Sequence, residues 1–485
     1  MLTKSNYFMT QYKKILIVNL EDTLLKSDIF LETFWSAFAK DPLIPIKIFF
    51  LILKGKNDFR KYLFDASNID FSTIPYNKKI LEYINTHYSK ETKVFLLTSN
   101  AKEIAKEIIK NIKIYNEKFH PSSKTNFYIL TWHDFERNKF GIKNYDFIGG
   151  YKTKSINWKK ANKAITFNLN KLQRRNCEIN NNDYIHIKNK DETNFLKNFL
   201  SSMRPYQWTK NILVFLPLLA SQKFENQLFI NSLFAFFSFC FIASSVYITN
   251  DLIDLKSDRN HPKKRNRPFA RGDLSIRFGS LGALALIVLG SSLGFQLGIK
   301  FLALISIYYL LTASYSLYFK KQALIDIFIL SALYTLRIIG GGISTDLTIS
   351  FWLLCFSLFN FLSLAAIKRQ AELKQLISIK KIKSFGRGYI IEDLNFVSFI
   401  AISSGLLSSL VLALYINSPK IIPLYPKSEF LWISCFLFLF WIIRMCFKTH
   451  KGEMEYDPII FAAKDKTSIL IFLVILILIL LASNI

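Results

Sequence analysis

The chain has 485 residues, of which 51% are hydrophobic, and its 63 Lys and Arg against 35 Asp and Glu give a formal net charge of +28. Such a charge is typical either of a nucleic-acid-binding protein with a basic face or of a membrane protein with basic cytoplasmic loops. Lys and Arg gather here in short connections between apolar segments, which favours a membrane protein and argues against nucleic-acid binding. The five cysteines form no CxxC or Cys/His cluster, so neither a zinc site nor a disulfide framework is predicted.

Residues 1–195 have the pattern of an α/β domain. Short β-branched runs end in polar turns and alternate with helical stretches such as 101–113, which is typical of a parallel, Rossmann-like sheet with crossover helices. The polar segment 177–195 is predicted to be a linker, so the chain divides into domains at 1–195 and 196–485. The strand candidates are 15–20, 93–100, 127–130 and 145–150.

From residue 205 onward, apolar segments follow one another, and several approach the ~20 residues that a membrane-spanning helix needs. The first is short and depends on the preceding RPYQWTK as an interfacial start. We therefore predict a multi-domain chain whose second part is an all-α polytopic bundle of about nine transmembrane helices. The segments are 211–221, 228–249, 277–297, 299–318, 323–342, 348–367, 393–416, 429–447 and 467–484.

The distribution of Lys and Arg among the connections predicts the orientation in the membrane. Rich connections alternate with poor ones, and the positive-inside rule places the rich ones in the cytoplasm. The N-terminal domain is then cytoplasmic and the C-terminus outside, in a multi-pass protein of the inner (plasma) membrane. The rich connections are 256–277, 319–321, 368–388 and 448–466, and the poor ones are 222–227, 343–349 and 417–428.

The stretch NDLIDLKSD at 250–258 places carboxylates at the end of an apolar segment, where an uncompensated charge is costly. On a helix, Asp251, Asp254 and Asp258 stand at i, i+3 and i+7 in one stripe. Such carboxylates repel each other unless a divalent cation lies among them, and Mg²⁺ prefers oxygen ligands that it shares with substrate phosphates. The stripe therefore predicts a Mg²⁺ site, and the alternative is an ordinary solvated helix end.

The basic loop after this stripe, RNHPKKRNRPFARG, offers a cationic complement for phosphate oxygens. On the alternative interpretation, its charges are those of any cytoplasmic loop. The candidate phosphate-binding residues are Arg259, His261, Lys264, Arg267 and Arg271.

NDLIDLKSDRNHPKKRNRPFARG resembles the NDxxDxxxD motif and following loop of the UbiA superfamily of intramembrane prenyltransferases. With RPYQWTKNILVFLPLLAS, YTLRIIGGG, AAIKRQAEL and KGEMEYDPIIFAAKD, it resembles the decaprenyl-phosphate phosphoribosyltransferase branch. The resemblance implies nine transmembrane helices around a cavity open to the cytoplasm and to lipid. It also implies that Asn250, Asp251, Asp254 and Asp258 hold Mg²⁺ and pyrophosphate. The implied donor is phosphoribosyl pyrophosphate and the implied acceptor a polyprenyl phosphate.

Other polar residues are expected to line the same cavity. Lys210 and Asn211 open the first apolar segment, and Tyr247 lies one turn before Asp251. Arg337 lies inside an apolar segment, where an arginine is costly. It is expected to make either a ligand contact or a structural pairing.

The last cytoplasmic connections carry two more candidate groups. Lys368 could reach a phosphate or pair with Glu372 four residues on. Glu453, Asp457 and Asp465 form a second acidic patch in KGEMEYDPIIFAAKD. The loop after the sixth segment is basic and lacks the second aspartate-rich motif of UbiA-type aromatic prenyltransferases, which argues against aromatic prenylation.

Near the N-terminus, IVNLEDTLL resembles the first motif of the haloacid dehalogenase superfamily, DxDGT[LV]. Asn19 stands at the nucleophile position and Glu21 at the acid/base position, while Thr23 remains. LLTSN offers the hydroxyl of the second motif through Thr98 or Ser99.

A later stretch, YDFIGGYKTKSINWKKANKAI, extends this resemblance. Gly149, Trp158 and Ala161 match, but Gly150 and Lys154 stand where the family has metal-binding aspartates. An amide cannot accept a phosphoryl group as a carboxylate does, and Mg²⁺ has little to hold it. We expect a haloacid dehalogenase-like domain without phosphatase activity.

The sequence as a whole favours a Mg²⁺-dependent membrane transferase that joins a polyprenyl lipid to a phosphorylated polar co-substrate. The favoured reaction moves 5-phosphoribose from phosphoribosyl pyrophosphate to a polyprenyl phosphate. The enzymatic alternative is aromatic prenylation of the quinone type, and a cation-coupled transporter is disfavoured because the stripe ends a helix at the cytoplasm. Whether the chain forms a homo-oligomer is left open.

Overall fold

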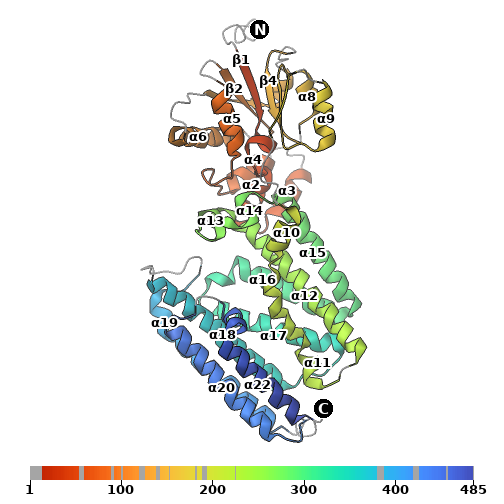
Figure 1. Cartoon of the computed structure of the whole chain (residues 1–485), viewed down its shortest axis with the longest axis vertical. Coiled ribbons are helices and arrows are strands. Elements are labelled where there is room, and N and C mark those ends of the chain that lie inside the picture. The colour runs from red at the N-terminus through yellow and green to blue at the C-terminus, as the bar shows by residue number, and fades with distance from the viewer. Residues whose placement is uncertain are drawn as a thin grey trace. The chain divides into compact units, whose positions relative to one another are not determined.

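The computed structural model divides the chain into two compact units. One comprises Met1–Met203 with Tyr247–Ala283, and the other comprises Arg204–Val246 with Leu284–Ile485. Figure 1 follows the chain from red at the N-terminus to blue at the C-terminus. The structure describes residues 14–53, 59–88, 92–99, 102–119, 126–137, 143–151, 153–180, 183–187, 194–223, 225–378, 387–418, 425–454 and 457–483.

The first unit is built on a six-stranded sheet (Figure 1). Its strand order is β3-β2-β1-β4-β5-β6, and all neighbouring strands are parallel. The central strand β1 reads KILIVN and buries its last four residues, as expected where helices cover both faces of a sheet. The predicted parallel α/β domain is confirmed. The strands are β1 (Lys14–Asn19), β2 (Thr92–Thr98), β3 (Asn126–Thr131), β4 (Asp146–Gly149), β5 (Ala164–Phe167) and β6 (Tyr184–Ile187).

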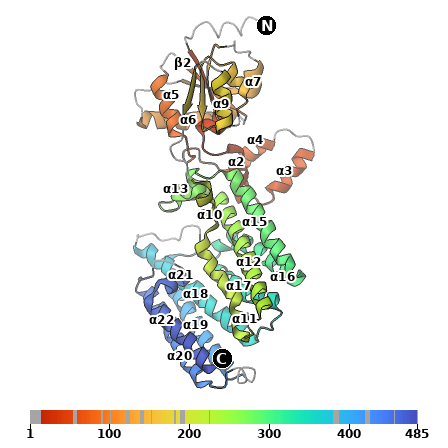
Figure 2. The same ribbon diagram turned by 45° about the vertical axis from the view of Figure 1, so that its right-hand side comes forward.

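Crossover helices cover the two sides of the sheet. α5 (Lys78–His87) and α6 (Lys102–Phe119) lie on one side, and α8 (Ser155–Lys159) and α9 (Lys171–Asn180) on the other (Figures 1 and 2). The predicted linker at 177–195 is wrong in part, because α9 continues into it and β6 pairs with β5 inside it. β6 is a half-buried edge strand, so it lacks the apolar run that marks a central strand.

A helical insertion separates β1 from α5. A π-helical turn, η1 (Leu20–Leu24), follows β1 directly. α2 (Ile29–Lys40), α3 (Ile44–Leu53) and α4 (Phe59–Ala66) come next and share a small apolar core (Figure 2). The other helices of this unit are α7 (Trp132–Arg137), α10 (Phe195–Met203), α13 (Leu255–Asn260), η3 (Lys264–Asn266) and α14 (Pro268–Arg271).

Long apolar helices dominate the second half of the chain. Among the described residues, seven helices are long and apolar enough to cross a membrane, or eight if the bent pair α21–α22 is one span. Each predicted apolar segment after the first overlaps one of these helices. They are α12 (Asn226–Ile253), α15 (Ile276–Gln296), α16 (Ile299–Leu317), α17 (Ile325–Thr345), α18 (Phe351–Ser378), α19 (Leu394–Ile416), α20 (Glu429–His450), α21 (Pro458–Lys464) and α22 (Lys466–Ala482).

The first predicted segment, 211–221, does not form a single long helix. Residues Pro205–Phe215 form a 3₁₀ helix, η2, and Leu216–Ser221 form a short α-helix, α11. Each element has a proline in its first turn, and a proline there starts a new helix more readily than it continues one. The expected count of about nine therefore compares with seven or eight long helices in the described part of the chain.

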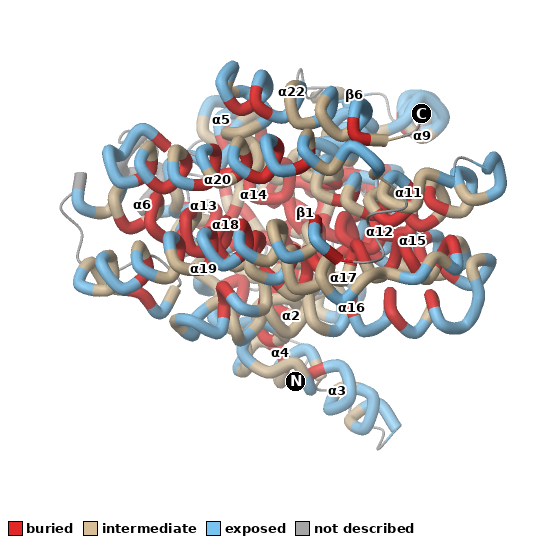
Figure 3. Tube along the Cα trace, turned by 90° about the horizontal axis from the view of Figure 1, so that it is seen from below, coloured by how far each residue is buried: buried red, intermediate tan, exposed pale blue. Residues whose placement is uncertain are grey.

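The outer faces of the spanning helices are apolar and exposed. Examples are Phe399 at 68%, Phe436 at 71% and Leu470 at 62% exposure. In Figure 3, α19 and α20 alternate between buried positions turned toward neighbouring helices and exposed positions turned away. Exposed apolar surface of this extent fits helices that contact lipid.

Candidate functional site

The acidic stripe lies where α12 gives way to α13. α12 ends at Ile253, and Asp254 separates it from α13. The helical hydrogen bonds continue across this break, since the Asp254 N–H donates to the Asn250 carbonyl at 2.9 Å and the Asp258 N–H to the Asp254 carbonyl at 2.8 Å. The helical spacing of Asp251, Asp254 and Asp258 at i, i+3 and i+7 therefore continues across the break.

Arg267 holds two carboxylates of the stripe together. Its Nη1 donates to Asp251 Oδ1 at 2.9 Å and to Asp258 Oδ2 at 2.6 Å. Asp251 is 2% exposed and Asp258 1% exposed, so both charges need such a partner. The loop between α13 and α14 thus brings a guanidinium into contact with the stripe, whereas the sequence predicts that Arg267 binds phosphate oxygens.

Asp258 has an oxygen that the protein does not satisfy. Its Oδ1 is buried and accepts no hydrogen bond, and Lys264 Nζ lies 3.9 Å away. Burial raises the pKa of Asp258, and Arg267 opposes that shift. An oxygen of this kind can ligate a cation or a substrate's donor group.

The donor chemistry of the stripe fits Mg²⁺ bound together with a substrate. Within the described residues, no three or more His, Cys, Asp or Glu side chains are grouped closely enough to hold a metal by themselves. Mg²⁺ commonly takes one or two protein carboxylates and completes its shell with phosphate oxygens and waters. Asp251 and Asp258 supply those carboxylates, with Arg267 beside them to meet phosphate.

The other predicted residues near the stripe differ in their burial and contacts. Tyr247, Asn250 and Asp254 are half-buried on α12 or at its end. His261 directly follows α13, and its Nδ1 accepts from the backbone N–H of Lys264 at 3.3 Å.

Arg259 does not point into the stripe but binds the helical insertion near the N-terminus. Its guanidinium donates to both carboxylate oxygens of Glu32 on α2, at 3.0 and 2.5 Å, and its Nε donates to the Ala270 carbonyl at 3.2 Å. The two charged side chains are 6% and 4% exposed. The sequence did not predict this bidentate pair.

Glu32→Gln is expected to loosen the loop that carries Asp258 and Arg267. The change leaves the Arg259 guanidinium buried without a counter-charge, which typically costs about 3–5 kcal/mol. Hydrogen–deuterium exchange of residues 255–272 in the purified chain should become faster than in wild type. Glu82→Gln, on an exposed position of α5, is the matched control and should leave this exchange unchanged.

A second polar cluster lies in the other unit and joins predicted residues that are far apart in sequence. Asp457 Oδ2 accepts from Lys210 Nζ at 2.9 Å and from Lys368 Nζ at 2.8 Å. Burial would raise the pKa of Asp457, but the two ammonium groups hold it well below its usual range. Asp457 also caps α21, because its Oδ1 accepts from the Ile459 N–H.

This lysine–aspartate cluster borders a largely apolar cavity of about 600 Å³. Lys210 lines the cavity, together with Pro458 and Ile459 next to Asp457. Asn360 is a polar residue in the largely apolar lining, and its Oδ1 is buried without a hydrogen-bond partner. The apolar lining comes chiefly from α18, α19, α20 and α22 and includes Phe356, Phe361, Leu412, Phe438, Trp441 and Phe472.

Arg337 is buried within α17, and each of its three guanidinium nitrogens donates a hydrogen bond to a protein group. Its Nε donates to Asn211 Oδ1 at 2.7 Å and its Nη2 to the Tyr308 hydroxyl at 2.7 Å, while Nη1 donates to the Leu333 carbonyl. The rings of Tyr308 and Tyr334 lie 5.0 and 5.4 Å from the guanidinium carbon. These contacts correspond to the structural pairing that the sequence left open.

The remaining acidic candidates each bind a different basic residue. Glu453 is exposed and pairs with Lys448 at 2.6 Å. Asp465 pairs with Arg444 at 2.7 Å and caps α22. The three residues of the expected acidic patch thus pair with different basic residues.

Glu372 takes part in a buried network that the sequence did not reveal. It accepts from Arg369 at 2.7 Å, and Arg369 also donates to Asp326 at 2.5 Å. Asp326 and Arg369 are 0% and 1% exposed. Asp326 lies at the start of an apolar segment, where a carboxylate needs a partner. That position was the one sequence feature that could have predicted a buried ion pair there.

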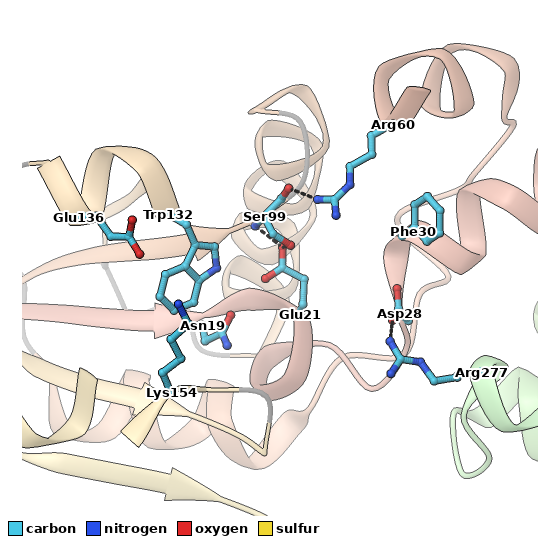
Figure 4. Close-up of a pocket in the computed structure, with 10 residues that line it drawn as sticks. All are labelled: Asn19, Glu21, Asp28, Phe30, Arg60, Ser99, Trp132, Glu136, Lys154 and Arg277. Carbon is cyan, nitrogen blue, oxygen red and sulfur yellow. Dashed lines mark hydrogen bonds and ion pairs between the residues drawn. The ribbon is translucent and has the colours of Figure 1, made fainter. Parts of the chain in front are cut away.

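The N-terminal unit has its own cavity, of about 440 Å³, at the carboxyl edge of the sheet (Figure 4). Glu21 accepts from Thr98 Oγ1 at 2.6 Å and from the Ser99 N–H at 2.7 Å. Burial raises the pKa of Glu21, and these hydrogen bonds oppose the shift. The first two motifs of the haloacid dehalogenase-like pattern therefore meet, as a parallel sheet requires.

In the later stretch that resembles the same superfamily, neither position 150 nor position 154 is acidic. Asn19 Nδ2 donates to Asp22 Oδ1 at 2.6 Å and to Thr153 Oγ1 at 3.1 Å. A Cβ atom at Gly150 would lie 2.4 Å from the Asp22 carbonyl oxygen, so a side chain at 150 does not fit this backbone. Lys154 lines the cavity with its positive charge. The absence of phosphatase activity remains a prediction.

Comparison with known proteins gives a family and several relatives. Residues 212–444 match the UbiA prenyltransferase family. Over 460 residues the chain is 29% identical to the uncharacterized protein y4nM of Sinorhizobium fredii, covering 93% of this chain and 88% of the relative. It is 34% identical over 279 residues to the nodulation protein NoeC of Azorhizobium caulinodans, covering 57% of this chain and 90% of NoeC.

Two further matches are more limited. The decaprenyl-phosphate phosphoribosyltransferase of Corynebacterium glutamicum is 35% identical over 191 residues, covering 38% of this chain and 58% of that enzyme. A solved UbiA homolog from Archaeoglobus fulgidus, bound to GPP and Mg²⁺, is 13% identical, covers 58% of this chain and 97% of its own, and has a TM-score of 0.42, which supports no closer comparison. The apolar helices, the family match and the extent of the NoeC match show that this chain is an integral membrane protein and belongs to the UbiA prenyltransferase family.

Proposed function

We propose that the chain transfers a 5-phosphoribosyl group from phosphoribosyl pyrophosphate to a polyprenyl phosphate. A phosphate oxygen of the lipid would attack C1 of the ribose, the C1–oxygen bond to pyrophosphate would break, and pyrophosphate would leave. The relative from Corynebacterium glutamicum, named for this reaction on decaprenyl phosphate, supports the proposal. The coarser statement, a UbiA-family transferase, does not depend on it.

The observation that carries the proposal is the buried pair Asp251 and Asp258, bridged by Arg267, with one unsatisfied Asp258 oxygen. These carboxylates, with Asn250 and Asp254, would hold Mg²⁺ together with the diphosphate of the donor. Bound there, Mg²⁺ would stabilise the negative charge that develops on departing pyrophosphate. Arg267, 26% exposed at its side chain, would turn from the carboxylates to the phosphate oxygens.

The second unit supplies groups suited to the lipid. We assign the apolar cavity to part of the polyprenyl chain, since such a wall favours hydrocarbon. Lys210 and Lys368 would bind the lipid phosphate, with Asp457 holding the two ammonium groups in position. Aromatic prenylation is disfavoured because the loop after α18 carries no second aspartate-rich motif.

We also infer the orientation of the chain in the membrane. The connection between α12 and α15 carries Arg259, Lys264, Arg267 and Arg271, and the positive-inside rule places it in the cytoplasm. The N-terminal domain, near 1–195, would then be cytoplasmic and the C-terminus outside the inner (plasma) membrane.

Membranes containing the chain should convert polyprenyl phosphate, Mg²⁺ and radiolabelled phosphoribosyl pyrophosphate into a lipid-extractable labelled product. Chelation of Mg²⁺ should abolish the product, and added Mg²⁺ should restore it. A parallel reaction with a labelled aromatic acid and a prenyl diphosphate tests the alternative. Product from the second pair alone would contradict phosphoribosyl transfer and leave the family assignment intact.

A further inference from the structure

Helix α3 has an apolar surface that the protein leaves uncovered. Its sequence is IPIKIFFLIL, and only Ile44 is fully buried, in the small core shared with α2 and α4. Six large apolar side chains on the helix and just before it are at least half exposed. They are Leu43 (56%), Ile46 (54%), Phe49 (60%), Phe50 (55%), Ile52 (56%) and Leu53 (65%).

A surface of this kind needs a partner. Soluble domains rarely expose so many large apolar side chains together, and such patches mark a membrane or protein interface. α3 has 10 residues and is therefore about 15 Å long, half of the ~30 Å needed to cross the hydrocarbon core. The helix can lie in a membrane surface but cannot span it.

The contacts of α2 place this insertion at the level of the membrane surface. The Trp35 indole N–H donates to Ser280 Oγ at 3.0 Å, and Ser280 lies on α15, one of the membrane-spanning helices. Arg277, in the first turn of the same helix, lies 3.6 Å from Asp28 (Figure 4). Asp28 immediately precedes α2, and α3 follows α2 after three residues. The insertion is thus attached to the end of a helix that enters the bilayer.

The charges around α3 fit the same partner. Lys47 lies on the helix and pairs with Asp41 at 2.5 Å, and Lys54 and Lys56 follow the helix in the sequence. Basic residues beside an apolar helix favour the anionic surface of a cytoplasmic leaflet.

We propose that α3 is a membrane-surface helix that inserts Phe49, Phe50 and Leu53 into the lipid headgroup region. The N-terminal domain is thereby held on the membrane next to the loop that carries the acidic stripe. This inference does not depend on the reaction that the chain catalyses.

The test uses the full chain in nanodiscs that hold one copy each, with a Phe50→Cys variant labelled with an environment-sensitive fluorophore. Lipids that carry a nitroxide quencher near the headgroup should quench this label at least about threefold more than a label at Leu172→Cys. Leu172 is 73% exposed on α9 beside the sheet and serves as the water-exposed control. Leu289→Cys, 50% exposed within α15, gives the signal expected in lipid.

Each result decides the proposal. Strong quenching at position 50 in single-copy discs supports insertion into lipid. Quenching no greater than at position 172 would overturn it, and crosslinking through position 50 in larger membranes that hold several copies would then assign the surface to a second chain. If the Phe50→Cys variant is not recovered folded, the same comparison at Leu53→Cys, whose side chain is 65% exposed, decides the question.

Discussion

Asp258→Asn is expected to lower transferase turnover by at least about 100-fold while the chain remains folded. The amide keeps the shape of the side chain and can still accept a hydrogen bond from Arg267, so the loop should stay in place. It removes the charge that a cation would meet at the unsatisfied Oδ1. Asp251→Asn should have a similar effect, because Asp251 shares the same guanidinium.

The measurement is turnover with phosphoribosyl pyrophosphate, together with Mn²⁺ binding in the presence of pyrophosphate. Asp273→Asn is the matched control, since Asp273 lies in the same connection but pairs with Arg271 at 2.6 Å. It should retain near wild-type turnover. Unchanged turnover in both Asp251→Asn and Asp258→Asn would show that the stripe is not the metal site, whatever the substrate proves to be.

The stripe could be predicted because its chemistry is local. Helical spacing placed Asp251 and Asp258 on one face, and the structure keeps that geometry across the break at Asp254. The bridge from Arg267 also lies within a short loop, only 9 and 16 residues from its two partners. Helix period predicts the shared face of the aspartates. The sequence assigned Arg267 to phosphate oxygens, and its bridge between the two carboxylates is a finding of the structure.

The contacts that sequence reasoning missed or left open join distant parts of the chain. Arg259 was expected to bind phosphate, yet it pairs with Glu32, 227 residues away. Lys368 pairs with Asp457, 89 residues away, instead of with Glu372 one helical turn on. Spacing along one helix carries no information about which face another helix presents, so such partners require the three-dimensional structure.

For the fold, too, local features could be predicted from the sequence and longer-range ones could not. Strands with continuous apolar runs, such as β1, were predicted, whereas the half-buried edge strand β6 was taken for a linker. The first apolar segment is helical, as its hydropathy predicts, but it does not form one long helix. Pro205 and Pro217 each start a new, shorter element. Hydropathy predicts which segments are buried in lipid or protein. Whether such a segment forms one continuous helix depends on its backbone, and here on its prolines.

Asp457→Asn is expected to lower the free energy of unfolding by about 3–5 kcal/mol. The change leaves Lys210 and Lys368 as two like charges beside an apolar cavity, with side chains that are 12% and 29% exposed. Thermal unfolding in detergent should show the loss. Glu453→Gln removes a carboxylate from an exposed pair with Lys448 and should change stability by no more than about 1 kcal/mol.

A triple variant then separates a structural role from a role in binding lipid. Replacing Lys210 and Lys368 by Met and Asp457 by Leu removes every buried charge of the cluster, and such replacements are often neutral or stabilising. The variant should therefore recover stability but fail to recover activity, because the lipid phosphate loses both of its ammonium partners. Recovery of activity with an unchanged KM for polyprenyl phosphate would show that the cluster only supports the fold, and the phosphate would then have to bind elsewhere.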